Sequence, residues 1–372
     1  MASSIKKEPL LFTPGPLTTS RQTKNSMLID YGSWDNDFNQ ITKEIRSRLI
    51  KIINGDKSFT CVPLQGSGTF GVEAMLINFI KKNEKILILI NGAYGERILS
   101  ICKYHRLKYS TLTWDENKSL NINALNKIIK NDKKIKHLAF VHCETSTGIL
   151  NPISKVSKIC KLNKINLYID AMSTYGAINI DCKKIKFKAL VASSNKCIEG
   201  VPGLSFCLTR ISDIKKCEGN SDNLSMDLFD QWRYMEKTER WRYTPPTHVV
   251  LAFLSALKQF EKEGGTKGRN LRYNENLNIL LLNMKRIGFR TLLAKSVQSP
   301  IIVTFLSPIN KKFIFVEFYN YLKKNGYIIY PGKMAIVDSF RIGCIGHIDK
   351  KNVKNLTSQI EKFLKIKKIT IN

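Results

Sequence analysis

Two charged residues stand where apolar runs of the sequence end, and together they have the functional groups for covalent chemistry on an aldehyde. Asp170 closes the run "NLYID", and Lys196 follows "KALVASSN". A buried lysine has a lowered pKa, and its neutral amine is a nucleophile that condenses with aldehydes. A buried carboxylate at a strand end is costly unless it has a positive partner. Each residue also has a plainer interpretation, Lys196 as a solvated amine and Asp170 as a helix N-cap or turn residue.

A glycine-rich turn upstream has the features of a phosphate site. In "LQGSGTFGVEAML", Gly66 and Gly68 lead into a helical pattern, and Ser67 and Thr69 add hydroxyl groups. The N–H groups at a helix start are free of intrahelical partners and carry the positive end of the helix dipole, so they suit a phosphate dianion. A turn that only caps its helix is the alternative.

An arginine near the C-terminus completes the set. Arg341 lies in the apolar stretch "SFRIGCIG", where its guanidinium offers a planar fork to a carboxylate or phosphonate, unless it serves a structural salt bridge. Pyridoxal phosphate has an aldehyde that requires an amine, a pyridine nitrogen that requires a carboxylate, and a phosphate that requires an anion site. We therefore predict pyridoxal 5'-phosphate as the cofactor and no metal site.

The segments that position these residues alternate between apolar runs and amphipathic stretches. The runs read as buried strands, at residues 85–91, 136–143, 166–171, 188–194 and 203–209. Between several of them, apolar residues recur every three to four positions, which is typical of helices. This alternation predicts an α/β domain with a largely parallel sheet, and active-site residues at the carboxyl ends of its strands.

The pattern changes near Thr247. A long helical stretch ends at Gly264 and Gly265, a second follows at "NENLNILLLNMKRIG", and short strands with a further helix then indicate a smaller α+β lobe. A chain of 372 residues also exceeds the roughly 250–300 residues at which single cores divide. The predicted division is an N-terminal segment packing on both lobes (1–20), a large cofactor-binding domain (21–255) and a small C-terminal domain (256–372).

The chain is strongly basic. Lysine and arginine number 60 against 30 acidic residues, which gives a formal charge of +30 and raises a basic nucleic-acid-binding protein on an enzyme fold as an alternative of another class. The lysines are scattered among asparagine and isoleucine, without aromatic interleaving or a known nucleic-acid-binding signature. We therefore interpret the charge as a bias of solvated faces and expect no nucleic-acid partner.

Cysteine usage and hydropathy favour a cytoplasmic protein. The nine cysteines are odd in number and contain no C-x-x-C pair, which indicates a reducing compartment. The N-terminal apolar run is too short for a secretory signal. The longest apolar run, "ILILI", falls far below the roughly 18 residues that a membrane span needs.

A series of motifs makes the chain similar to the class V aminotransferases of fold-type I, the family related to alanine:glyoxylate aminotransferase. They run from about Leu10 to His347 and include "TPGPLTTS", "GSWDNDF", "NGAYGER", "HCETSTGILNPI", "YIDAMSTYGA", "SSNKCIEGVPG", "RYTPPTH" and "FRIGCIGH". The resemblance implies an α/β fold-type I transferase, with a mainly parallel seven-stranded sheet in the large domain and a smaller α+β C-terminal domain.

The resemblance also assigns roles to single residues. It implies that Lys196 is the Schiff-base lysine, that Asp170 is the partner of the pyridinium nitrogen, and that Arg341 binds the substrate anion. The other cofactor-binding residues that it implies are the phosphate cup Ser67, Gly68 and Thr69 with the neighbouring Asn195, the aromatic Tyr94 on the cofactor face, Thr145 near the ring, and Thr244, which reaches the phosphate of a neighbouring subunit. The role of Thr244 implies a homodimer with two shared sites.

The implied reaction is a ping-pong transamination. The motifs "TPGPLTTS", "GSWDNDF" and "RYTPPTH" resemble the branch of the family that moves the amino group of 2-aminoethylphosphonate to pyruvate, giving phosphonoacetaldehyde and L-alanine in phosphonate degradation. Alanine:glyoxylate and serine:pyruvate transamination are the alternatives, since they share every cofactor residue. A desulfurase would need a cysteine on a mobile loop, whereas Cys344 lies in an apparent strand.

Overall fold

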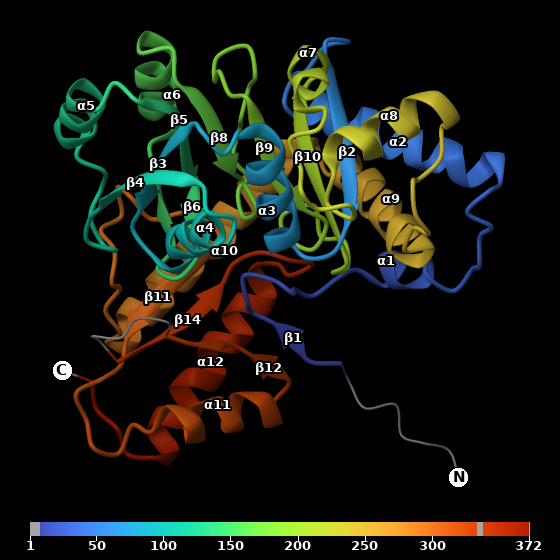
Figure 1. Ribbon diagram of the computed structural model, residues 1–372. Coiled ribbons are helices and arrows are strands. Elements are labelled where there is room, and N and C mark those ends of the chain that lie inside the picture. The colour runs from blue at the N-terminus through green and yellow to red at the C-terminus, as the bar shows by residue number, and fades with distance from the viewer. Residues whose placement is uncertain (1–7, 333–337, 372) are drawn as a thin grey trace.

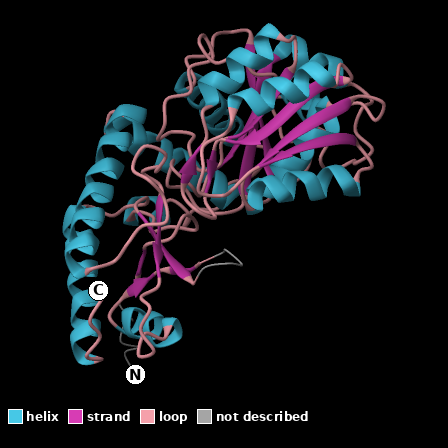
Figure 2. Ribbon diagram, turned by 90° about the vertical axis from the view of Figure 1, so that its left-hand side faces the viewer, coloured by secondary structure: helices cyan, strands magenta, loops and turns pink. Residues whose placement is uncertain are grey.

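The computed structural model describes residues 8–332 and 338–371, so residues 1–7 of the predicted N-terminal segment lie outside the described residues. A large lobe has helices on both sides of a central sheet, and a smaller lobe lies beside it (Figures 1 and 2). No helix in the described ranges is both long and apolar enough to cross a lipid bilayer.

The central sheet has seven strands in the order β2-β10-β9-β8-β5-β3-β4. The strands are β2 (Phe59–Gln65), β3 (Lys85–Ile90), β4 (Lys108–Thr113), β5 (Ile135–Val141), β8 (Asn166–Asp170), β9 (Ala189–Ser193) and β10 (Leu204–Arg210). Strand β10 is antiparallel to both of its neighbours, and the pairs from β9 through to β4 are parallel. The mainly parallel seven-stranded sheet is therefore confirmed.

The sequence interpretation missed two of these strands, β2 and β4. Strand β4 is one of the two edges of the sheet and is largely exposed, so it carries polar residues in place of an apolar run. Strand β2 contains Pro63, a residue that weakens any prediction of a strand because it lacks an N–H group. The other five strands lie where the apolar runs predicted them.

Helices cover both faces of the sheet because its inner strands are apolar on both sides. Along β3, Leu87 and Leu89 face one core cluster, whereas Ile86, Ile88 and Ile90 face the other, as the alternation of side chains in a strand requires. The helices of this lobe are α1 (Arg21–Asn25), α2 (Asn36–Ile52), α3 (Gly68–Phe79), α4 (Ala93–Tyr104), α5 (Ile122–Asn131), α6 (Ile153–Leu162), α7 (Ile211–Ile214), α8 (Leu228–Thr238) and α9 (Thr247–Lys262), with a 3-10 turn at Lys215–Cys217. The first cluster packs α2, α5, α6 and α9, and the second packs α3 and α4.

The parallel strands end at one edge of the sheet and bring distant parts of the chain together there. Tyr94 follows β3, Thr145 follows β5, Asp170 ends β8, and Lys196 follows β9. A two-stranded ribbon, β6 (Cys143–Glu144) with β7 (Ile149–Leu150), extends from the end of β5. The candidate active-site residues therefore lie at the carboxyl ends of the strands, where the alternation of strands and helices predicts an active site.

The smaller lobe is a three-stranded antiparallel sheet against long helices, in the lower part of Figure 1. Its elements are β11 (Ile302–Leu306), β13 (Tyr330–Pro331), β14 (Ser339–Gly343), α10 (Gly265–Ile287), α11 (Phe315–Lys324) and α12 (Lys350–Ile366). Phe340 of β14 is buried among several aromatic rings, including Phe305, Phe313 and Phe318. The α+β character of this lobe is confirmed.

The N-terminal segment touches both lobes. Strand β1 (Leu10–Leu11) pairs with β12 (Tyr327–Ile328), which belongs to the smaller lobe. A few residues later, the carbonyl oxygens of Pro14 and Gly15 accept hydrogen bonds from Lys196 of the large lobe.

A buried charge network joins the loop between β9 and β10, which contains Lys196, to the smaller lobe. Glu199 accepts hydrogen bonds from Arg272 Nη2 at 2.8 Å and Tyr273 OH at 2.6 Å, and Arg269 Nη1 lies 3.3 Å from it. Arg272 Nη1 also donates to the carbonyl of Ile348 at 3.0 Å. Helix α10 therefore begins at Gly265, earlier than its apolar pattern predicts, because its first turns bury charged residues against Glu199.

Candidate active site

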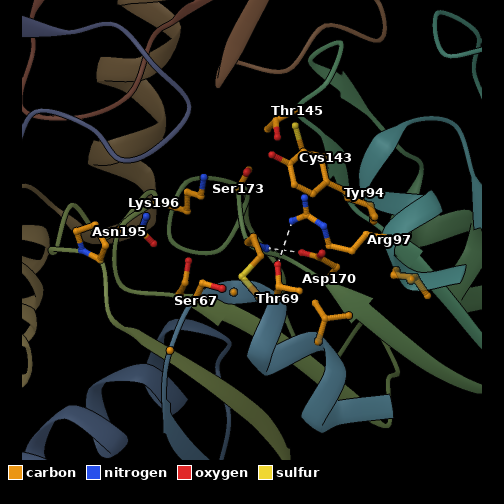
Figure 3. A pocket seen from close by; sticks show the side chains of 18 of the residues that line it. Ser67, Thr69, Tyr94, Arg97, Cys143, Thr145, Asp170, Ser173, Asn195 and Lys196 are labelled. Carbon is orange, nitrogen blue, oxygen red and sulfur yellow. Dashed lines mark hydrogen bonds between the residues drawn. The ribbon is translucent and has the colours of Figure 1, made fainter. Parts of the chain in front are cut away.

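One cavity of about 440 Å³ opens at the carboxyl edge of the sheet (Figure 3). Eight of the residues singled out from the sequence line it: Ser67, Gly68, Thr69, Tyr94, Thr145, Asp170, Asn195 and Lys196. Figure 3 shows the side chains of these residues other than Gly68 around a shared space, although the residues come from β8 and from four separate connections after other strands. Thr244 and Arg341 are outside the lining.

Lys196 presents a buried amine to this cavity. Its Nζ donates to the carbonyl oxygens of Pro14 at 2.9 Å and Gly15 at 3.2 Å, and it has no ion-pair partner in the described part of the chain. Burial lowers the pKa of Lys196 to about 8, although the charge of Asp170 acts in the opposite direction. At neutral pH the amine is therefore far more easily deprotonated than a surface lysine.

The contact with the N-terminal segment requires a glycine. Gly15 has φ +116°, and a Cβ there would lie 2.6 Å from Lys196 Cδ and 2.7 Å from Nζ. The two carbonyl groups thus approach the amine closely enough to orient it. The motif "TPGPLTTS" contains this glycine, but the sequence did not reveal the contact.

The pKa of Lys196 predicts when its amine becomes reactive. In competitive labelling of the cofactor-free protein with acetic anhydride, followed by mass spectrometry, we expect a midpoint near pH 8 for Lys196. Lys118 provides the internal reference, because its hydrogen bond with Asp115 raises its pKa above the ordinary 10.5. A midpoint for Lys196 as high as that of Lys118 would contradict the buried-amine description.

Asp170 is a buried carboxylate with one oxygen available to the cavity. The amide of Met172 donates to its Oδ1 at 3.0 Å, and no other described residue donates to this side chain. Burial raises the pKa of Asp170 to about 6, while Lys196 and Arg97 act to lower it. The carboxylate is therefore ionised at neutral pH and able to accept a hydrogen bond from a protonated ring nitrogen.

The start of α3 has the features of an anion site. Ser67 is the N-cap of this 12-residue helix, and its hydroxyl makes no capping bond with the described residues. The first N–H groups of a helix have no intrahelical acceptor, so those of Gly68 and Thr69, which line the cavity, are available to an anionic ligand. A Cβ at Gly68 would lie 2.6 Å from Met172 Sδ, which explains why a glycine occupies this position.

Tyr94 belongs to the first turn of α4, and a residue that the sequence interpretation missed lies behind it. The guanidinium of Arg97 lies 4.9 Å from the centre of the Tyr94 ring, and its Nη1 donates to Thr69 Oγ1 at 3.0 Å. Arg97 also lines the cavity. The signal was present in "NGAYGER", because residues three apart share a helix face.

Arg341 and Thr244 occupy the surroundings of the cavity. On β14, Arg341 donates from Nη1 to the carbonyl of Thr145 at 2.8 Å and from Nε to that of Pro331 at 3.0 Å. Its Nη2 donates to none of the described residues, and its charge contributes to the lowered pKa of Lys196. Thr244 is exposed in the loop before α9, and its carbonyl accepts a hydrogen bond from Gln65.

This set of groups fits pyridoxal phosphate. An amine with a pKa near 8 suits the cofactor aldehyde, and a buried carboxylate with a free oxygen suits the ring nitrogen. The helix start suits the phosphate, and Tyr94 lines the same cavity with an aromatic ring. The residues that would hold the group thus converge in one cavity.

The chain is similar along nearly its whole length to proteins of known name. It is 47% identical over 363 residues to the 2-aminoethylphosphonate--pyruvate transaminase of Pseudomonas aeruginosa, which covers 98% of each chain. It is 46% identical over 361 residues to the protein of the same name from Pseudomonas putida, which covers 97% of this chain and 98% of that one.

Solved structures and a family model agree with this similarity. An alanine--glyoxylate aminotransferase from Nostoc superposes with a TM-score of 0.89 at 21% identity, over 98% of this chain and 97% of that one. A ureidoglycine-glyoxylate aminotransferase from Bacillus subtilis superposes with a TM-score of 0.88 at 20% identity, over 99% and 95% of the chains. The model of the class-V aminotransferases matches residues 21–329. With its fold and most of its length in agreement, the chain belongs to the class-V aminotransferase family.

Proposed function

We propose that this protein transfers the amino group of 2-aminoethylphosphonate to pyruvate, giving phosphonoacetaldehyde and L-alanine. The observation that carries the proposal is the cavity in which Lys196 and Asp170 lie together beside the start of α3. The name and the 47% identity of the Pseudomonas aeruginosa relative support the choice of substrates.

The chain's own groups have separable tasks in this reaction. Pyridoxal phosphate, the cofactor of the family, supplies when bound an electron sink and carries the amino group between the two substrates. Lys196 Nζ removes a proton from the substrate carbon that bears nitrogen and later returns a proton, which its lowered pKa allows near neutrality. Asp170 would keep the cofactor's ring nitrogen protonated, and the N–H groups of Gly68 and Thr69 would bind its phosphate.

Arg341 is the residue that we assign to the substrate anion. Two backbone carbonyls fix its guanidinium, and Nη2 donates to no described residue. A phosphonate and a carboxylate are both anions that such a fork can hold, so one arginine serves 2-aminoethylphosphonate and pyruvate in turn.

This assignment predicts both the preferred donor and the effect of removing the guanidinium. We expect kcat/KM for 2-aminoethylphosphonate to exceed that for alanine and serine, with glyoxylate as the common acceptor. In Arg341→Ala, kcat/KM should fall about 10-fold to 150-fold for 2-aminoethylphosphonate and for pyruvate alike, the loss of one charge-assisted interaction. Arg290→Ala, an exposed arginine of the same lobe, is the control and should stay within about twofold of the parent. Preferential use of alanine or serine would favour the alanine:glyoxylate or serine:pyruvate alternative.

The proposal includes a homodimer in which Thr244 serves the partner's phosphate site. Its exposure outside its own cavity supports this, as do large apolar side chains at the surface, including Leu28 at 81% and Trp34 at 69% exposure. Sedimentation should give twice the 42.5 kDa mass of one chain. A monomer that retains full activity would remove the role of Thr244.

The remaining features of the proposal concern organisation and location. We divide the chain into an N-terminal segment (1–20), a large domain (21–255) and a small domain (256–372). The pairing of β1 with β12 and the hydrogen bond from Lys196 to Pro14 support the packing of the N-terminal segment on both lobes. The boundary between the two domains lies within α9. A cytoplasmic location is supported by the nine cysteines, all of which are free and buried.

A protein that binds nucleic acid through its +30 charge is the alternative from another class. It predicts affinity for duplex DNA or RNA that falls steeply with salt. We expect weak binding that disappears at physiological salt.

A further inference from the structure

The turn from Glu144 to Gly148 contains a fully buried carboxylate that the proposed reaction does not use. Glu144 has 0% exposure. Its Oε2 accepts hydrogen bonds from the amides of Tyr94 at 3.0 Å and Gly95 at 3.3 Å, and its Oε1 accepts from Ser146 N at 3.2 Å and Ser146 Oγ at 2.7 Å. No described lysine, arginine or histidine forms an ion pair with Glu144. Both oxygens are therefore held by neutral donors, and two of these donors begin the helix that carries Tyr94.

Glu144 supplies the cap that α4 lacks. The residue before this helix is Gly92, which has no side chain to accept from the first N–H groups. A carboxylate from another element takes that role, and its negative charge faces the positive end of the helix dipole. The fit is tight, since a Cβ at Gly92 would lie 2.4 Å from Glu144 Cγ and 2.5 Å from Ser146 Oγ.

The same turn contacts the smaller lobe on its other side. The carbonyl of Thr145 accepts from Arg341 Nη1 at 2.8 Å, and the carbonyl of Thr147 accepts from Thr304 Oγ1 of β11 at 2.8 Å. One short turn thus links the helix of Tyr94 with the strand of Arg341. Moving Glu144 would change the relation between these two groups, because no side chain of α4 replaces its hydrogen bonds.

We propose that Glu144 is a positioning residue that fixes the distance between the Tyr94 face of the cavity and the Arg341 guanidinium, and thereby selects donors by the spacing between their amine and their anion. The selection rests on the proposed function, in which Arg341 holds the substrate anion. The anchoring of Tyr94 by Glu144 does not rest on the proposed function, because it concerns only the side of the cavity that would face the cofactor.

Two substitutions test the position of the carboxylate, and one tests loss of a cap in general. Glu144→Gln turns one oxygen into an NH2 group, which cannot accept from the N–H groups that it faces. Gly92→Ala keeps the charge but displaces the carboxylate. Asn121→Ala is the matched control: Asn121 caps α5 through bonds to the amides of Asn123 and Ala124 at 3.0 and 3.1 Å, outside the residues that line the cavity.

Two measurements on the full-length protein separate positioning from stability. The first is the dissociation constant of pyridoxal phosphate by equilibrium dialysis, which should rise about tenfold in Glu144→Gln and Gly92→Ala. The second is the ratio of kcat/KM for 2-aminoethylphosphonate to that for 3-aminopropylphosphonate, which is one methylene longer. This ratio should fall about tenfold in both variants, whereas Asn121→Ala should lower only the melting temperature.

The outcomes are distinct. Unchanged cofactor affinity and donor ratio in Glu144→Gln would overturn the proposal. A change in these two quantities in Glu144→Gln that Gly92→Ala does not reproduce would also overturn it, because the charge of Glu144 and not its position would then be responsible. Ser146→Ala removes one hydrogen bond and should shift both quantities in the same direction by about threefold, which keeps the test available if the other variants fold poorly. If the parent protein does not use 2-aminoethylphosphonate, the proposed function fails, and the cofactor affinity still decides the role of Glu144 toward Tyr94.

Discussion

Replacing Lys196 by alanine is expected to lower kcat for transamination by a factor of about 10⁴ or more. The expected loss is large because, in the proposed reaction, one amine both holds the cofactor aldehyde and moves the proton at the substrate carbon. Proton transfer by a positioned side chain alone contributes about 10² to 10⁴. Steady-state formation of alanine from 2-aminoethylphosphonate and pyruvate measures the effect on kcat. The purified variant should also lack the absorbance of lysine-bound cofactor.

Lys188 provides the control for this substitution. Its Nζ forms an ion pair with Asp213 Oδ1 at 2.6 Å, and both residues are outside the cavity lining. Lys188→Ala therefore removes a partly buried lysine without touching the site and should keep kcat within about twofold. Unchanged absorbance and turnover in Lys196→Ala would show that another residue does the chemistry.

Replacing Asp170 by asparagine is the second large change. The amide keeps the shape of the side chain but loses the charge that, in the proposed reaction, would hold the cofactor's ring nitrogen in its protonated form. We expect kcat to fall by about 10² to 10³, the range for removing one preorganised electrostatic group. The variant should still fold, because an amide is less costly to bury than a carboxylate whose pKa burial has raised to about 6.

Steady-state kinetics with 2-aminoethylphosphonate and pyruvate measure this loss. Asp213→Asn is the matched control, since it removes a carboxylate from a lysine pair remote from the cavity. If kcat falls no further in Asp170→Asn than in Asp213→Asn, Asp170 is not the partner of the cofactor's ring nitrogen.

The sequence predicted those parts of the fold that have a local signal. The inner strands could be predicted because each is buried on both faces and so consists of apolar residues. The edge strand β4 could not, since its exposed face favours polar residues. The first turns of α10 were also missed, because Arg269 and Arg272 are buried through Glu199, a partner that lies about seventy positions away in the chain.

The site also has residues that could be predicted from the sequence and residues that could not. Asp170 and Lys196 were predictable because the ends of neighbouring parallel strands meet at one edge of the sheet. Arg97 and Glu144 stand in recognised motifs, but their roles depend on Thr69 and on the start of α4, contacts that only the folded chain creates. The carbonyl groups that hold Lys196 were missed for the same reason, because a backbone contact across 181 positions leaves no mark in the pattern of side chains.

The absorbance spectrum of the purified protein tests the central claim most directly. We predict a visible band from cofactor bound at Lys196, which disappears when 2-aminoethylphosphonate is added without an acceptor and returns when pyruvate follows. A preparation without this band after incubation with pyridoxal phosphate, or a band that 2-aminoethylphosphonate leaves unchanged, would contradict the account.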